Sequence, residues 1–137
     1  MKEKIRVLVI GAGSFVNRGV ESYLLGMYEN IDHEKIAMDF LTPLDCKNEN
    51  IFNTVSANGD QVIELRLKLN RKFKRQVVLY RAIKYFLRNH DYDVVYINTG
   101  SPLTMAIEVA AAYHNNIPYR IVHAHNGGKA SIKETFI

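Results

Sequence analysis

The sequence predicts an α/β domain built on a doubly wound parallel sheet of five strands. Five short apolar segments alternate with four helical patterns along the 137 residues, and this alternation is typical of parallel sheets with helices on both faces. The first apolar segment, residues 5–10, runs directly into a glycine-rich loop and then into a helical pattern. Because crossover connections are right-handed, we expect a Rossmann-like strand order of 3-2-1-4-5, with a crevice between the first and fourth strands.

The first helix follows from the spacing of the apolar residues after the glycine-rich loop. One stripe at helical spacing contains Val20, Tyr23, Leu24, Met27, Tyr28 and Ile31, whereas Glu21, Ser22 and Glu29 fall off it. A single apolar stripe of this kind predicts an amphipathic helix on the surface of the sheet.

The remaining elements follow the same alternation. Further strands are expected at residues 36–42, 61–65, 93–98 and 119–123. The second helix is expected at residues 48–58, closed by Gly59. A basic segment at residues 66–75 leads into a third helix that ends near residue 90. The inward-facing residues of these two helices are expected to be Ile51, Phe52 and Val55, and then Leu79, Ile83, Phe86 and Leu87.

The fourth helix, residues 103–113, has the clearest start. Ser101 is an N-cap residue and Pro102 suits the first helical position. Almost every residue of this helix is apolar, so we expect it to pack closely on the sheet.

Composition indicates one globular domain, residues 1–137. Hydrophobic residues make up 47% and charged residues 23% of the chain, which excludes a disordered protein. No apolar run is long enough to cross a bilayer. The single cysteine, Cys46, has no partner for an internal disulfide, so we expect a cytoplasmic protein. The net charge of +4 favours an anionic partner.

The glycine-rich loop is the first candidate site. Gly11, Gly13 and Gly19 lie between a strand and a helix, where backbone N–H groups and the helix dipole favour an anion. The dinucleotide-binding pattern is not met, because Val16 occupies its third glycine position. Two interpretations stay open at this point: the glycines bind an anion, or they serve a tight turn and close packing.

The carboxyl ends of the strands gather several loops at one edge of the sheet, at residues 11–19, 42–46, 98–101 and 123–128. His123 and His125 lie two residues apart in this edge, so their side chains can point the same way. They are either ligands for a substrate or satisfied imidazoles at a strand end. A metal site is not expected, because no third and fourth ligand has a recognisable spacing.

A family resemblance covers nearly the whole chain. Residues 6–11, Arg-Val-Leu-Val-Ile-Gly, and residues 17–22, Asn-Arg-Gly-Val-Glu-Ser, resemble the opening of retaining glycosyltransferases of the GT4 type from capsular and exopolysaccharide clusters. The resemblance continues in residues 28–32, 38–41, 92–96 and 120–126. The chain departs from that family in two ways: Val20 replaces the second glycine of a Gly-Gly pair, and the loop contains an additional Phe15 and Val16.

The resemblance implies the N-terminal, acceptor-side half of a two-domain GT-B glycosyltransferase. Its C-terminal donor domain would be missing from these residues. The implied donor substrate is a nucleotide-sugar, with no other cofactor, and the acceptor is a saccharide that can be lipid-linked. The substrate-binding residues are then expected to be Gly11, Gly13, Ser14, Asn17, Arg18, Gly19, Asn98, Thr99, His123, His125 and Asn126, with His125 the candidate catalytic residue.

The basic segment offers a second candidate surface. Arg71, Lys72, Lys74 and Arg75 lie at its end, and we expect either a solvated helix entrance or a peripheral contact with the anionic inner face of a membrane. No nucleic-acid-binding module accompanies the charge. Two alternatives to a glycosyltransferase therefore remain: a stand-alone Rossmann-like nucleotide-binding domain, and a non-enzymatic domain that binds anionic membrane. An exposed face where a second domain would dock is also expected to favour self-association.

Overall fold

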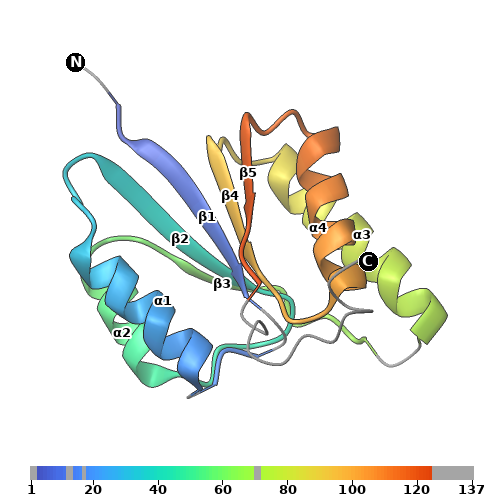
Figure 1. Ribbon diagram of the computed structural model, residues 1–137, viewed down its shortest axis with the longest axis horizontal. Helices are drawn as coiled ribbons and strands as arrows, with labels where there is room; N and C mark the ends of the chain where they lie inside the picture. The colour runs from blue at the N-terminus through green and yellow to red at the C-terminus, as the bar shows by residue number, and fades with distance from the viewer. Residues whose placement is uncertain (1–2, 12–13, 17, 70–71, 125–137) are drawn as a thin grey trace, which may run out of the picture.

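The structure is a computed structural model that describes residues 3–11, 14–16, 18–69 and 72–124, with the backbone alone for residues 72 and 73. Within these residues the chain forms the predicted five-stranded parallel sheet, in the order β3-β2-β1-β4-β5 (Figure 1). The elements are β1 (Ile5–Gly11), α1 (Gly19–Asn30), β2 (Ile36–Thr42), α2 (Glu49–Ala57), β3 (Val62–Glu64), α3 (Lys72–Arg88), β4 (Val94–Asn98), α4 (Pro102–His114) and β5 (Tyr119–Val122). The fold is therefore a Rossmann-like α/β domain.

Helices cover the two faces of the sheet in pairs. Helices α1 and α2 lie on one face, and α3 and α4 lie on the other (Figure 1). Alternate residues of the central strand β1 pack against the two helix layers. Val7 and Val9 pack towards α1 and α2, whereas Leu8 and Ile10 pack towards α3 and α4. All four are buried, as expected for a central strand that is covered on both sides.

The predicted helix ends are largely confirmed. Asn48 caps α2, since its side-chain oxygen accepts a 3.1 Å hydrogen bond from the Ile51 amide. Ser101 caps α4 in the same way, with Pro102 as the first helical residue. Gly59, after α2, has a φ of +85°, a conformation that glycine adopts without strain. The start of α3 differs from the expectation, because the helix begins at Lys72, inside the basic segment.

Three expectations about burial were wrong. Tyr23 lies on the predicted apolar stripe of α1, but 46% of its surface is exposed. Phe52 was expected to face inward, but 43% of its surface is exposed, while Ile51 and Val55 alone carry the inner face of α2. Glu21 falls off the apolar stripe of α1, yet it is only 1% exposed. It is buried because Arg18, three residues earlier, supplies an ion-pair partner.

The last strand, β5, is the least covered part of the sheet. It is an edge strand that pairs with β4 alone, and its four residues are all exposed. Tyr119 and Ile121 lie in register with Val94 and Tyr96, which pack towards α1 and α2. Tyr119 and Ile121 therefore face the α1 and α2 side, where no described helix reaches them. No helix in the described ranges is long and apolar enough to span a membrane.

Candidate functional site at the carboxyl edge of the sheet

The candidate site lies where β1 and β4 end side by side. Gly11, the last residue of β1, is in register with Asn98, the last residue of β4. The connection after β1 leads to α1 on one face, and the connection after β4 leads to α4 on the other (Figure 1). This divergence is the topological switch point at which open α/β sheets bind ligands.

Close packing explains the first glycine of the loop. A Cβ atom at Gly11 would collide with the ring of Phe15, which is completely buried against Phe40 and the α1 layer. Phe15, one of the two residues that are additional relative to the GT4-type loop, thus fills the space beside Gly11. Of the two interpretations of the glycines, anion binding or close packing, close packing therefore explains Gly11.

The loop is also fixed to the connection that follows β2. Phe15 and Cys46 form an isolated parallel bridge. The Phe15 amide donates to the carbonyl of Asp45 at 3.2 Å, and the Lys47 amide donates to the carbonyl of Phe15 at 2.8 Å. The Ser14 hydroxyl donates a short hydrogen bond to the Asp45 carboxylate. Ser14, a predicted binding residue, is therefore engaged within the loop.

Arg18 and Gly19 present a different surface at the start of α1. Gly19 is exposed, and a side chain there would meet no described atom within 4 Å, so packing does not require its small size. The Arg18 guanidinium donates two hydrogen bonds to the Glu21 carboxylate, at 2.9 Å and 3.2 Å. This bonding raises the pKa of Arg18, and 53% of its side chain stays exposed. A guanidinium thus lies, held in place, at a helix N-terminus.

The structure separates residues that the sequence placed in one cleft. Successive side chains of a strand point to opposite faces, so Asn98 lies on the α1 side of β4 and Thr99 faces α4. Asn98 is 2% exposed, and its amide donates to the carbonyl of Tyr96 at 3.2 Å. His123, next to the end of β5, donates its backbone N–H to the carbonyl of Ile97. Asn98 and His123 therefore do not share a pocket with Thr99.

His123 belongs to a cluster with two tyrosines. Its Nδ1 atom shares a 2.6 Å hydrogen bond with the Tyr96 hydroxyl, and its ring lies edge-on against Tyr23 at 5.3 Å between centroids. The Tyr23 and Tyr96 hydroxyls are 3.4 Å apart. Burial, followed by the hydrogen bond to Tyr23, raises the pKa of Tyr96. The interpretation of His123 as a satisfied imidazole is the one that these contacts favour.

On the opposite face, Thr99 lines a cavity of about 220 Å³ between β1, α3 and α4. Glu108, from the middle of α4, also lines it and is completely buried. Burial raises the pKa of Glu108 to about 8, an effect that the nearby Thr99 hydroxyl partly opposes. Sequence reasoning missed Glu108. The signal was present, since Glu108 is the one acidic residue in a helix that is otherwise almost wholly apolar.

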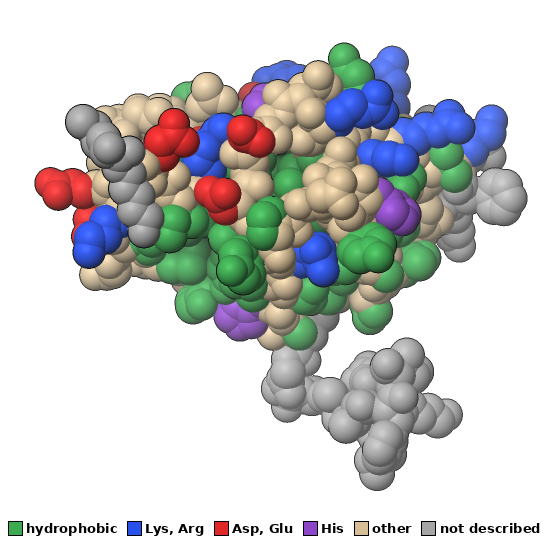
Figure 2. Space-filling model, turned by 90° about the horizontal axis from the view of Figure 1, so that it is seen from above, with side chains coloured by type: hydrophobic (Ala, Val, Ile, Leu, Met, Phe, Trp, Pro, Cys, Tyr) green, Lys and Arg blue, Asp and Glu red, His purple; other side chains and the backbone are tan. Residues whose placement is uncertain are grey.

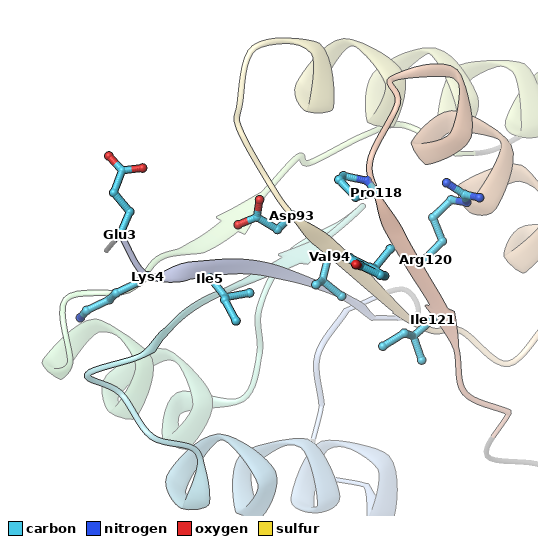
Figure 3. A pocket seen from close by; sticks show the side chains of 9 residues that line it. Glu3, Lys4, Ile5, Asp93, Val94, Pro118, Arg120 and Ile121 are labelled. Atoms are coloured by element: carbon cyan, nitrogen blue, oxygen red, sulfur yellow. The ribbon is translucent and has the colours of Figure 1, made fainter. Parts of the chain in front are cut away.

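A larger hollow, of about 630 Å³, lies at the opposite edge of the sheet, where β1, β4 and β5 begin. The side chains of Ile5, Val94 and Ile121 point to the same side there, the side on which α1 lies (Figure 3). Asp93 accepts a hydrogen bond from the Arg6 amide at 2.9 Å. The hollow is the uncovered part of the sheet, and its polar groups do not converge on a common point. We therefore place the candidate site at the carboxyl edge.

The basic flank, defined as Lys74, Arg75, Arg81 and Arg88, follows α3. All four residues are exposed, and Arg75 also reaches the cavity that Glu108 lines, where it donates to the carbonyl of Leu69 at 3.1 Å. Figure 2 shows Lys and Arg side chains gathered towards the right-hand end of the molecule, the end at which Figure 1 draws the start of α3.

Several predicted site residues lie outside the part of the chain that the structure describes. They are Gly13, Asn17, Arg71, His125, Asn126 and the side chain of Lys72. Among the described residues, no three His, Cys, Asp or Glu side chains are grouped so that they could hold a metal ion.

Comparison with known proteins supports the class of fold. No family model and no curated protein matches the chain. Two solved structures of the C-terminal domain of a hydrogenase from Pyrococcus furiosus are similar to it, each with a TM-score of 0.55 over 88% of this chain. The sequence identities are 15% and 19%, and 92% and 93% of those domains are covered. At these identities the likeness shows a shared α/β fold and carries nothing about function.

Proposed function

We propose that this chain forms the acceptor-side half of a retaining glycosyltransferase that moves a sugar from a nucleotide-sugar to a saccharide acceptor in surface polysaccharide synthesis. The observation that carries the proposal is the Arg18–Glu21 pair. Both residues belong to the segment that resembles the opening of GT4-type enzymes, and they lie at the carboxyl edge of the sheet. The fold is also the kind from which each half of such an enzyme is built.

The chemistry that Arg18 supports is electrostatic. Transfer of a sugar from a nucleotide leaves negative charge on the departing phosphate, and fixed donors near that phosphate lower the barrier. The Glu21 carboxylate holds one edge of the Arg18 guanidinium at 2.9 Å and 3.2 Å, while half of the side chain remains exposed to a ligand. Gly19 leaves space beside it for close approach to the backbone.

The first test is the coding sequence downstream of residue 137. An open frame that continues into a second α/β domain is the expected result, and a stop codon there would contradict a two-domain enzyme. The complete product is then assayed for transfer of labelled sugar from nucleotide-sugars. Arg18→Lys keeps the charge but loses the paired N–H geometry, so we expect kcat to fall about tenfold or more. Lys35→Ala, at an exposed ion pair with Asp32, is the matched control and should leave kcat unchanged.

The basic flank favours a second function, attachment to an anionic membrane surface. Helix α3 contains six basic residues and no acidic one, and each basic residue near such a surface contributes about 1 kcal/mol. Charge reversal of Arg71, Lys72 and Lys74 should abolish co-sedimentation with phosphatidylglycerol vesicles. Phosphatidylcholine vesicles are the control. Equal sedimentation of the wild-type chain with both vesicles would contradict the idea.

A further inference from the structure

The cavity between β1, α3 and α4 contains two neighbouring buried polar side chains whose hydrogen-bonding capacity is not met by the described residues. Glu108 is 0% exposed and Thr99 is 2% exposed. Neither oxygen of the Glu108 carboxyl group and no atom of the Thr99 hydroxyl has a hydrogen-bond partner among the described residues. Buried polar groups are nearly always hydrogen-bonded, because leaving one unsatisfied destabilises the folded state. Two such groups side by side in one cavity offer hydrogen-bonding positions that a ligand can use.

The lining of the cavity separates polar from apolar groups. The polar part comes from Thr99, Glu108 and the first turn of α4, where Ser101 and Thr104 supply hydroxyl groups. The apolar part comes from Pro43, Leu69 and Leu79. A cavity of about 220 Å³ is smaller than the roughly 300–1,000 Å³ of sites for drug-sized ligands. It therefore suits one small ring or a short polyol.

The protonation of Glu108 limits the chemistry of the partner. With a pKa of about 8, the carboxyl group is mostly neutral below that pH, and it then offers one O–H donor and one carbonyl acceptor. Arg75 on α3 is the one other charged side chain among the residues that line the cavity, and no ion pair joins it to Glu108. A cation would not be held by a neutral acid, whereas hydroxyl groups both donate and accept hydrogen bonds.

We propose that this cavity binds a small polyhydroxylated ligand, such as a saccharide ring, through neighbouring hydroxyl groups held by Glu108 and Thr99. The carbonyl oxygen of the carboxyl group accepts from one ligand hydroxyl, and its O–H donates to the next. The Thr99 hydroxyl adds a third contact from β4, and the apolar residues cover the carbon face of the ring. This proposal does not depend on the glycosyltransferase function, because its hydrogen bonds come from Glu108 and Thr99 and not from the Arg18–Glu21 pair.

D-glucose is the probe, and cyclohexanol is the control of similar ring size that lacks neighbouring hydroxyl groups. At 15.7 kDa the chain is suited to amide NMR titration. We expect saturable shifts with D-glucose, concentrated at Thr99, Gly100, Thr104 and Glu108, and none with cyclohexanol. Binding should weaken as the pH rises through about 8, because the carboxyl group then loses its donor.

Three variants test the assignment of the contacts. Glu108→Gln keeps a neutral donor and acceptor, so it should bind D-glucose and should no longer weaken above pH 8. Glu108→Leu and Thr99→Val each remove polar contacts, and each should weaken binding about tenfold or more. Thr99→Val is nearly isosteric and keeps the test valid if Glu108→Leu does not fold.

The result that would overturn the proposal is equally specific. If D-glucose produces no saturable shifts up to its solubility, the cavity does not bind a saccharide ring. If the shifts survive unchanged in Thr99→Val and in Glu108→Leu, the sugar binds elsewhere. Either outcome removes the site, and neither affects the test of glycosyl transfer.

Discussion

Two glutamates lie buried in helices on opposite faces of the sheet, and they are stabilised in different ways. Glu21 in α1 is 1% exposed and accepts two hydrogen bonds from Arg18. Glu108 in α4 is 0% exposed and has no partner in the described part of the chain. A charged group can be buried if it is paired, and otherwise it becomes neutral. Glu21 follows the first course and Glu108 the second.

The two sides of the carboxyl edge also differ in whether their polar side chains have hydrogen-bond partners. On the α1 side, Arg18 satisfies Glu21, Asp45 accepts from Ser14, and His123 shares a hydrogen bond with Tyr96. On the α4 side, the Thr99 hydroxyl and the Glu108 carboxyl group have no hydrogen-bond partner among the residues that the structure describes. The polar groups of the first side are bonded to one another, whereas those of the second side are open to a ligand.

The largest expected effect is a pH dependence of stability that Glu108→Gln removes. The unfolded chain releases the Glu108 proton near the ordinary pKa of 4.5, and the folded chain releases it near 8. Between these values the folded state holds the additional proton, so the free energy of unfolding decreases as the pH rises, by at most about 1.4 kcal/mol per pH unit. The stabilisation is complete below pH 4.5 and lost above 8, a total of about 5 kcal/mol.

Urea denaturation of the wild type and of Glu108→Gln across this pH range measures the difference. The two should be about equally stable at the acidic end, and the variant should be the more stable by about 5 kcal/mol at the alkaline end. Parallel curves would show that Glu108 ionises normally in the folded chain, and the contrast with Glu21 would then disappear.

The strands and their order could be predicted from the sequence, because apolar runs and helical spacing reflect burial directly. Residues 36–42, for instance, form β2 with the predicted bounds. Ser101 and Pro102 fixed the start of α4 for an equally local reason. These signals depend on neighbours in the sequence alone.

The sequence predicts that the candidate site lies at the carboxyl edge of the sheet, but it does not predict which side chains meet there. Strand parity places Asn98 and Thr99 on opposite faces, and only the packed helices show that Thr99 shares a cavity with Glu108. Spacing marks Glu21 as polar, but it does not show that Arg18 turns back to pair with it. Phe52 was expected inside because its sequence position fits the stripe, whereas Ile51 and Val55 are the buried residues of α2. Partners distant in the chain decide each of these cases.

A smaller effect is expected from Arg18→Ala, which leaves the Glu21 carboxylate buried without its two hydrogen bonds. We expect a loss of about 2 kcal/mol in the free energy of unfolding. This is less than for a fully buried pair, since Arg18 is half exposed and water can reach the vacated position. Adding Glu21→Gln to Arg18→Ala should recover part of the loss, because a neutral amide is less costly to bury. If the double variant is less stable than the single one, then pairing is not what permits Glu21 to be buried.

The smallest effect is expected from Thr99→Val, which sharpens the comparison because it removes a buried hydroxyl group that has no hydrogen-bond partner among the described residues. In most buried positions this change costs about 1 kcal/mol or more, since a hydrogen bond is lost. Here the chain without ligand should be unchanged or stabilised by up to about 1 kcal/mol, because an unsatisfied polar group is replaced by a methyl group of similar shape. Thr42→Val is the matched control: it is also fully buried, and its hydroxyl accepts from the Leu44 amide at 3.2 Å, so it should destabilise the chain. Equal losses in the two variants would mean that Thr99 has a partner, and the cavity would then lack one of the two groups that define it.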